Sequence, residues 1–273
     1  MANVAHSRRV ANEIRMLQRD RESLAARGIY FSVDEADMLR IDVLVVPRAK
    51  ADIDVPGLES PYTGGFFLFE VRLGADYPMG PPLLTFHPQQ PHCRLHPNYY
   101  ENGKVCLSVV NTWGASDWTP ALSVLALIDT LEARFNERPL CFEPGRENAP
   151  LESLKAYNRS VAYGVLKWAV APVVRGGHAR SSAYDSFAEA IRAEFERDSA
   201  AHLLRLDALE AAEAEAAGRP KQVFYSHPAD PPDTAGLRAE LQALQALQAL
   251  QALQALQALQ ALQALQAKVA EPT

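Results

Sequence analysis

The chain has 273 residues, a formal net charge of −6 and 22% charged residues of both signs. No apolar run approaches the roughly 20 residues that span a membrane, and Met1 to Arg9 lacks an apolar signal segment; we therefore expect a cytoplasmic or nuclear protein without a membrane partner. No basic stripe or aromatic ladder accompanies the charge, which argues against nucleic acid as a partner.

Three cysteines, Cys93, Cys106 and Cys141, are odd in number and follow no spacing pattern. This argues against a disulfide framework and against a zinc site. His92, Cys93 and His96 lie close together in the sequence, but a fourth ligand at usable spacing is missing. We therefore expect no metal and no cofactor, and we interpret Cys93 and Cys141 as structural or incidental.

The first part of the chain predicts one helix followed by strands. Apolar residues recur at helical spacing from Val10 to Leu17, and Gly28 follows as a C-terminal cap. Two alternating apolar runs lie farther on, over residues 39–45 and 67–73, and they are separated by segments rich in Pro and Gly. We therefore expect a helix and then a short antiparallel meander.

The later part of the chain predicts helices. Thr119 can cap, and Pro120 can occupy the first turn of, a helix with an apolar stripe over residues 125–135. Two further stripes, over residues 154–168 and 184–195, carry aromatic side chains that we interpret as core or docking faces. A helix, several strands, a loop and then helices indicate the α+β class.

The C-terminal segment is a repeat. From Leu241 to Ala267 the triplet Leu-Gln-Ala occurs nine times, and because three residues advance a helix by about 300°, the leucines wind around its surface. The repeat predicts a helix without a coiled-coil seam. The repeat is either an arm that oligomerises or binds a partner, or a slipped nucleotide repeat that is tolerated because it lies beyond the fold. We prefer the second interpretation. We divide the chain into a domain over residues 1–215, a Pro-rich linker over 216–240 and the repeat tail over 241–273.

One stretch carries a candidate for chemistry, because it places Cys106 eight residues after Asn98 among turn-forming residues. Proline, asparagine and glycine favour an irregular surface loop, in which the Cys106 thiol would be accessible as a nucleophile. The Asn98 amide could donate either to the loop backbone or to an oxyanion formed at an attacked carbonyl. The alternative is that Cys106 is a small buried hydrophobe between two apolar neighbours.

At these residues the sequence resembles the ubiquitin-conjugating enzymes. The matching segments stand in the family's order: Tyr62-Thr63-Gly64-Gly65, Tyr77-Pro78-Met79-Gly80-Pro81-Pro82, His96-Pro97-Asn98, Asn102-Gly103-Lys104-Val105-Cys106-Leu107-Ser108 and Trp118-Thr119-Pro120-Ala121. Five segments in one order argue strongly against a chance match. The long insertion between Cys106 and Trp118 and the later Phe142-Glu143-Pro144-Gly145 resemble the large, extended members.

The resemblance implies a ubiquitin-conjugating fold with an N-terminal helix, an antiparallel four-stranded meander, the catalytic loop and C-terminal helices. It implies that Cys106 carries ubiquitin or a ubiquitin-like protein as a thioester and passes it to a substrate lysine. Asn98 would stabilise the oxyanion or hold the loop in place, and His96 would have a structural role. Small members often have an aspartate where this chain has Ser108, so Asp117 and Glu143 are the candidate acidic groups.

The resemblance also implies partner surfaces. Arg8, Arg9 and Arg15 on the first helix resemble the basic face that docks the activating enzyme, although a basic helix face is usually just solvated. Met79, Pro120 and Ala121 fall where family members meet ligases of the RING type.

Two other classes of protein remain open. The first is a non-catalytic ubiquitin-binding scaffold that keeps the fold. The second is a cysteine hydrolase that pairs Cys106 with His96 or His178, although His178 lacks an identifiable orienting partner.

Overall fold

A single antiparallel sheet forms the centre of the computed structural model, which describes residues 2–50, 55, 57–88, 94–114, 117–176, 182–215 and 233–270. The strands are β1 (Ile29–Val33), β2 (Arg40–Val45), β3 (Phe67–Arg72) and β4 (Leu83–His87), and they pair in sequence order. Helices precede and follow the sheet. The expected α+β fold with a four-stranded meander is confirmed.

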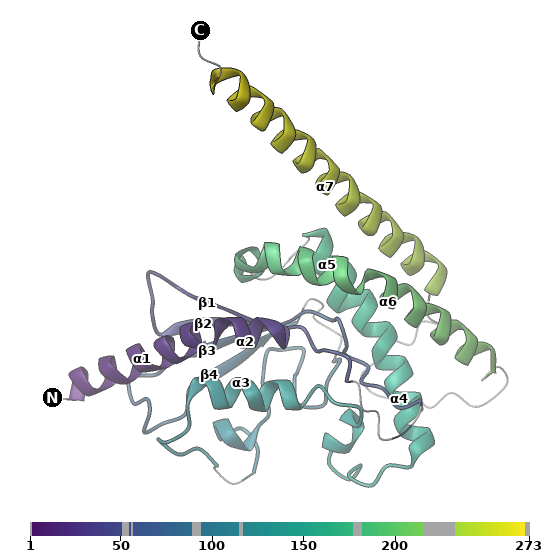
Figure 1. Ribbon diagram of the computed structural model, residues 1–273. Helices are drawn as coiled ribbons and strands as arrows, with labels where there is room; N and C mark the ends of the chain where they lie inside the picture. The colour runs from purple at the N-terminus through teal and green to yellow at the C-terminus, as the bar shows by residue number, and fades with distance from the viewer. Residues whose placement is uncertain are drawn as a thin grey trace.

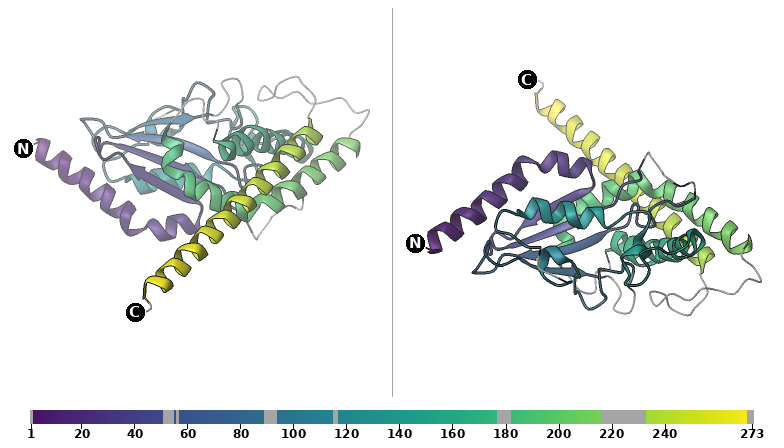
Figure 2. Two further views of the ribbon diagram at one scale, coloured as in Figure 1. Left: turned by 90° about the horizontal axis from the view of Figure 1, so that it is seen from above. Right: turned by 90° about the horizontal axis from the view of Figure 1, so that it is seen from below.

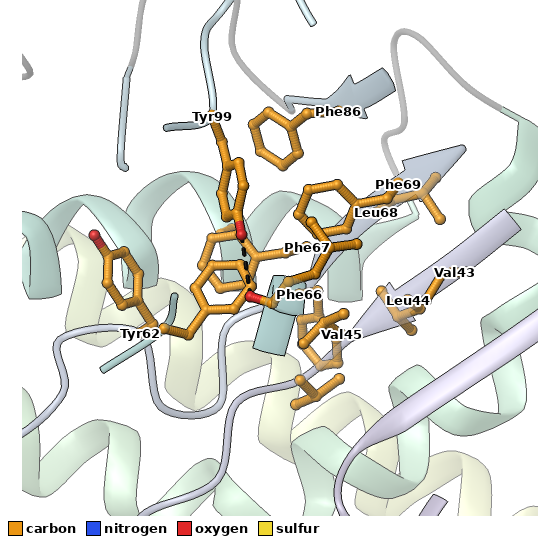
Figure 3. Packing of buried hydrophobic residues seen from close by; sticks show 14 of the residues in the cluster. Val43, Leu44, Val45, Tyr62, Phe66, Phe67, Leu68, Phe69, Phe86 and Tyr99 are labelled. Carbon is orange, nitrogen blue, oxygen red and sulfur yellow. Dashed lines mark hydrogen bonds between the residues drawn. The ribbon is translucent and has the colours of Figure 1, made fainter. Parts of the chain in front are cut away.

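The first face of the sheet packs against α3 (Val124–Ala133). Val43, Phe69 and Phe86 lie in register across three strands, and the Phe69 ring meets the Tyr99 ring at a centroid distance of 5.0 Å. Figure 3 shows this aromatic layer, in which Tyr99 Oη donates to Leu131 O on α3 at 3.0 Å. The segment that ends at Tyr99 is therefore anchored to the core.

The second face of the sheet is buried as well. Tyr30, Leu44 and Leu68 lie in register on it, and Leu44 and Leu68 are fully buried. The 3₁₀-helix η4 (Ser182–Phe187) contacts β1 and β2, and Tyr30 Oη donates to Glu194 of α6 (Ala188–Glu215). Figure 1 shows α3 and α6 on opposite sides of the strands. The C-terminal helices thus complete a three-layered body.

The N-terminal part contains two helices where the sequence predicts one. They are α1 (Ala2–Arg19) and α2 (Arg21–Ala26), separated at Asp20. Gly28 follows with φ +83°, and a Cβ there would lie 2.2 Å from Val46 O. The predicted role of Gly28 as the end of the helical region is confirmed, and a side chain there would clash with the backbone just after β2.

The predicted start of α3 is wrong. Thr119 and Pro120 lie in a turn closed by the Leu122 amide and Thr119 O at 3.0 Å. The helix begins at Val124, and the Ser123 side chain caps it by accepting from the Ala126 amide at 3.1 Å. The sequence shows that Thr119 could cap a helix, but it does not show that Thr119 lies in a separate turn and that Ser123 is the cap.

A broken run of helices leads from α4 (Leu151–Gly164) through the π-helix η3 (Val165–Val170) to α5 (Ala171–Arg175). These elements lie beside α6, which has contacts with both α4 and α5. Cys141, on the preceding 3₁₀-helix η2 (Pro139–Phe142), is a half-buried free thiol. Cys93 and His92 lie outside the described residues.

The C-terminal helix α7 (Thr234–Ala270) begins inside the segment that we assigned to a linker. Asp233 caps it by accepting from the Gly236 amide at 2.8 Å, so residues 234–240 are helical, and residues 216–232 lie outside the described residues. Leu237, Leu241 and Leu244 are buried where α7 contacts α6. The leucines from 247 to 262 are 50–53% exposed, and Figures 1 and 2 show that part projecting from the body.

Within the described ranges, no helix combines the length and the apolar character that crossing a bilayer needs. The same residues contain no group of three or more His, Cys, Asp or Glu side chains that could hold a metal ion.

Candidate active site

Cys106 lies where the chain returns from a tight turn into the body of the domain. Gly103 adopts φ +90° in the turn, and Tyr99 then pairs with Val105 in an antiparallel bridge. The Cys106 amide donates to Asn98 O at 2.8 Å. These bonds draw Val105, Cys106 and Leu107 inward, and Cys106 is 3% exposed. The expectation of an accessible thiol is therefore wrong for this conformation.

The segment after Cys106 folds back over it. It forms the 3₁₀-helix η1 (Ser108–Val110) and reverses at Asn111, which adopts φ 58°. Thr112 Oγ1 then accepts from the Leu107 amide at 2.9 Å and donates to Leu107 O at 3.0 Å. Cys106 Sγ donates to Thr112 O at 3.4 Å. We call these contacts of Thr112 with Cys106 and Leu107 the Thr112 clasp.

The environment of Cys106 favours the neutral thiol. Burial raises the pKa of Cys106, while the charges of Lys104 and Arg94 lower it and that of Glu143 raises it. The thiol therefore stays protonated at neutral pH, as its hydrogen bond to Thr112 O requires. Because the thiolate is the nucleophile, this conformation holds Cys106 in an unreactive state.

Asn98 is bonded to the backbone of the cysteine itself. Its Nδ2 donates to Cys106 O at 3.0 Å, and the side chain is 8% exposed. Its Oδ1 is buried and has no hydrogen-bond partner among the described residues. The structure thus places the Asn98 carboxamide beside Cys106, where it joins the segment at Asn98 to the segment at Cys106. The second N–H of Nδ2 can donate to another acceptor.

His96 uses both ring nitrogens inside the fold. Its Nδ1 accepts from the Asn98 amide at 3.0 Å, and its Nε2 contacts Arg134 O at 3.0 Å. Burial lowers the pKa of His96 to about 3, so the ring is neutral, with the proton on Nε2, which donates to Arg134 O. A ring held in this way has no free nitrogen to deprotonate Cys106. His178, the other base of the hydrolase alternative, lies outside the described residues.

The two candidate acidic groups differ in their surroundings. Glu143 forms an ion pair with Arg94 at 3.4 Å and is half-buried, and its charge acts on Cys106. Asp117 is exposed, and its amide donates to Ser108 O at 3.3 Å. The fold therefore brings Asp117 next to the position two residues after the cysteine.

The three arginines of α1 do not share one surface. Arg8 and Arg15 are exposed, whereas Arg9 Nε donates to Glu13 Oε1 at 2.7 Å and Arg9 Nη2 to Leu122 O at 2.6 Å. Grouping Arg9 with a free basic face is therefore wrong, because its guanidinium is bound within the structure. Helical spacing alone could not show that Leu122 lies within reach of Arg9.

The candidate ligase-facing residues lie on two adjoining loops. Met79 is 76% exposed, and Pro120 and Ala121 are exposed too. Trp118 Nε1 donates to Pro78 O at 2.8 Å and joins the two loops. Residues from separate sequence segments therefore form one exposed surface.

Sequence reasoning missed three residues that organise the site. Glu13 is 1% exposed and accepts from Tyr77 Oη at 2.6 Å and from the Val124 amide at 3.0 Å, which links α1 to the Met79 loop and to α3. Arg94 lies over the Tyr100 ring at 3.9 Å and donates to Pro97 O. Thr112 closes the clasp. One local signal pointed to Glu13: it stands at helical spacing between Val10 and Leu17, on the apolar face of the helix, where a buried side chain is expected.

Residues 11–151, just over half of the chain, match a family model described as ubiquitin-conjugating enzyme. The chain belongs to the ubiquitin-conjugating enzyme family. The matched range contains Asn98, Cys106 and the Thr112 clasp, whereas η3, α5, α6 and α7 lie beyond it.

The similar proteins are long members of this family. Ubiquitin-conjugating enzyme E2 Z of Homo sapiens is 34% identical over 152 residues, which cover 55% of this chain and 40% of that protein. The dual E2 ubiquitin-conjugating enzyme/E3 ubiquitin-protein ligase BIRC6 of Homo sapiens is 30% identical over 190 residues, which cover 63% of this chain and 4% of that protein. The resemblance to the large members is confirmed, and the chain spans less than half the length of these relatives.

A solved structure, a ubiquitin-conjugating enzyme E2 from Plasmodium falciparum, matches with a TM-score of 0.36 and 20% identity. The match covers 48% of this chain and 83% of that chain.

Proposed function

We propose that this chain carries ubiquitin, or a ubiquitin-like protein, as a thioester on Cys106 and transfers it to a lysine of a substrate. The observation that carries the proposal is the position of Cys106 in the run Asn-Gly-Lys-Val-Cys-Leu-Ser, with the Asn98 amide on its carbonyl at 3.0 Å. Membership of the ubiquitin-conjugating enzyme family supports ubiquitin transfer at the level of the family.

The reaction consists of two acyl transfers. In the first, the Cys106 thiolate attacks the thioester carbonyl of ubiquitin on an activating enzyme, whose own thiol leaves as the new thioester forms. In the second, a lysine amine attacks the Cys106 thioester, the amine loses a proton, and the Cys106 thiolate leaves as the isopeptide bond forms. The second N–H of Asn98 can stabilise the oxyanion of either intermediate.

Charging requires the Thr112 clasp to open. The thiol is buried and donates to Thr112 O at 3.4 Å, so a bulky thioester cannot reach it in the clasped state. Opening breaks that contact, the two hydrogen bonds of Thr112 Oγ1 with Leu107 and the bond from the Thr112 amide to Leu107 O at 3.1 Å. Each contributes about 1 kcal/mol, a cost that binding of the activating enzyme can offset.

The partners follow from the same proposal. Exposed Arg8 and Arg15 on α1 are the basic groups offered to the activating enzyme, and Met79, Pro120 and Ala121 form the surface offered to a RING-type ligase. Asp117 is the better placed acidic group for the attacking lysine, since it is exposed beside Ser108, whereas Glu143 is paired with Arg94.

The test is a charging assay with the full chain, ubiquitin, an activating enzyme and ATP. We expect an adduct that thiol reductant destroys, that Cys106→Ala abolishes, and that Cys106→Ser converts to a reductant-resistant ester. Cys141→Ala is the matched control, because Cys141 is also a free thiol, and it should charge normally.

One observation favours a second function, a ubiquitin-binding scaffold without catalysis. The buried, protonated state of Cys106 suits a fold whose cysteine has no chemical task. If no adduct forms with any activating enzyme or modifier, while ubiquitin still binds, the scaffold replaces the enzyme.

A further inference from the structure

A cavity of about 220 Å³ lies between α6 and the chain segments that flank β2 and β3. Its walls include Arg48 and Thr63 from those segments and Arg197, Asp198, His202 and Arg205 from α6. The first two residues lie within the family match and the other four lie beyond it. The cavity therefore forms where the conjugating domain meets its C-terminal extension, and none of its lining residues belongs to the Cys106 site.

His202 is a buried polar side chain on the wall of this cavity that lacks hydrogen bonds. It is 1% exposed, and neither ring nitrogen has a hydrogen-bond partner in the part of the chain that the structure describes. Burial lowers the pKa of His202 to about 4, so the neutral ring presents one donor and one acceptor. Buried polar groups in native proteins are nearly always paired, which points to a partner that occupies the cavity.

The ring of His202 is held firmly in place. Its face lies against the Phe195 ring at a centroid distance of 6.0 Å. On another side is Gly64, where a Cβ would come within 2.5 Å of His202 Cε1. A glycine at this point, with φ +73°, leaves the room that the imidazole fills. His202 is thus a rigid element of a prepared site.

The cavity also holds positive charge in excess. Arg48 and Arg197 both pair with Glu194, and Arg197 also pairs with Asp198 at 2.7 Å. Arg205 donates one hydrogen bond, from Nη1 to Thr63 O at 2.8 Å, and no carboxylate of the described residues forms an ion pair with it. Burial lowers the pKa of Arg205, so its charge is poorly solvated. The lining itself contains three guanidinium groups and one carboxylate, that of Asp198, whereas Glu194 and Glu59, which also act on these arginines, lie outside it.

We propose that this cavity binds a phosphate group, either free or as a small phosphate monoester, on Arg205, Arg197 and His202. The guanidinium fork of Arg205 matches two phosphate oxygens, and His202 donates to a third. An Asp or Glu side chain of a partner protein would fit the charge but would leave more of the donors unused. All three groups belong to α6, and Arg205 also donates to Thr63 O of the conjugating domain at 2.8 Å.

The experiment uses the full chain in buffers of constant ionic strength. Sodium phosphate and glycerol 3-phosphate are titrated separately against sodium chloride, with the unfolding temperature and calorimetric binding as readouts. We expect both phosphates to raise the unfolding temperature and to bind with a Kd on the order of 1 mM or tighter. If only inorganic phosphate binds, the ligand is the free ion. If glycerol 3-phosphate binds as well, the cavity also accepts a phosphate monoester.

Variants separate a ligand site from a merely structural cluster. Arg205→Met should weaken phosphate binding at least about tenfold, whereas Arg192→Gln, an exposed arginine on the same helix, should leave it unchanged. Should Arg205→Met not fold, His202→Phe remains informative. It keeps the ring stacked on Phe195 and removes two unpaired nitrogens, so it should match or exceed the unfolding temperature of the parent in chloride and lose the response to phosphate. No response of the parent protein beyond chloride, or an undiminished response in both variants, overturns the proposal.

Discussion

The Sγ atom of Cys106 donates a hydrogen bond to the carbonyl oxygen of Thr112 at 3.4 Å. The acceptor lies six residues along the chain, on the far side of a left-handed turn at Asn111. This contact, together with burial, keeps the thiol protonated and covered. The reactivity of Cys106 therefore depends on how often the Thr112 clasp opens.

Thr112→Ala should make the thiol more reactive, because it removes both hydrogen bonds of Thr112 Oγ1 with Leu107. At about 1 kcal/mol for each bond, the two together amount to about 2 kcal/mol, so the open state should become about thirtyfold more populated. The measurement is the rate of modification by an aromatic disulfide reagent in a background of Cys93→Ser and Cys141→Ser. Thr119→Ala, at an exposed threonine, is the control and should react like the parent. Equal rates in both variants would show that the clasp does not cover Cys106 in solution.

Asn98→Ala should impair discharge to free lysine more than charging. Loss of an oxyanion donor typically lowers a rate by about 10²–10³. The acyl donor is a thioester in both steps, but the thiolate that attacks in charging is a stronger nucleophile than the amine that attacks in discharge. Single-turnover discharge and charging are measured side by side. Circular dichroism controls for the lost bond to Cys106 O. If both steps fall equally, Asn98 only holds the loop.

Glu13→Gln should destabilise the domain by about 2–3 kcal/mol. The carboxylate is 1% exposed and accepts from Arg9, Tyr77 and the Val124 amide, so the amide substituent places a donor against other donors. Urea unfolding measures the change. Glu22→Gln, at an exposed position of α2, should leave the midpoint unchanged. A midpoint equal to that of the parent for Glu13→Gln would contradict this account of the joint between α1 and α3.

Stability should fall as the pH drops from 7.5 to 5. The pKa of His96 is lowered to about 3 in the fold, whereas the unfolded chain titrates near 6.5. Protons therefore bind the unfolded state first, and His96 contributes a loss of about 2 kcal/mol by pH 5. His202, with its pKa lowered to about 4, adds to the same trend.

The variant His96→Asn isolates this contribution. Asparagine can still accept from the Asn98 amide, but it does not titrate, so the difference in unfolding free energy between the two pH values should shrink. An unchanged pH dependence would mean that His96 is protonated in the native protein.

The C-terminal repeat should contribute to stability only near its start. Leu241 is 2% exposed and Leu256 is 51% exposed, although both begin a Leu-Gln-Ala triplet of the repeat. Leu241→Ala should therefore weaken docking of α7 on α6 by about 2–3 kcal/mol, and Leu256→Ala should have almost no effect. Hydrogen exchange of the amides in residues 234–246 measures the docking. Similar exchange in both variants would argue against the docked arrangement.

The sequence determined the family, the α+β class and the meander, because these follow from local signals. Strands reveal themselves by alternation, as between Ile41 and Val45, and the order of five short segments identifies the family without any knowledge of contacts. Turn residues such as Asn102 and Gly103 indicated a reversal of the chain, and φ +90° at Gly103 agrees.

Tertiary structure alone decided which of these residues meet. Cys106 was expected on an open loop, but its exposure depends on Thr112 folding back and on the bridge from Tyr99 to Val105. Arg9 was grouped with the exposed Arg8 and Arg15, yet it donates to Leu122 O, 113 residues away. Periodicity reports which face of its own element a side chain lies on. It carries no information on which distant segment covers that face, and this covering determines burial, pKa and access to the thiol.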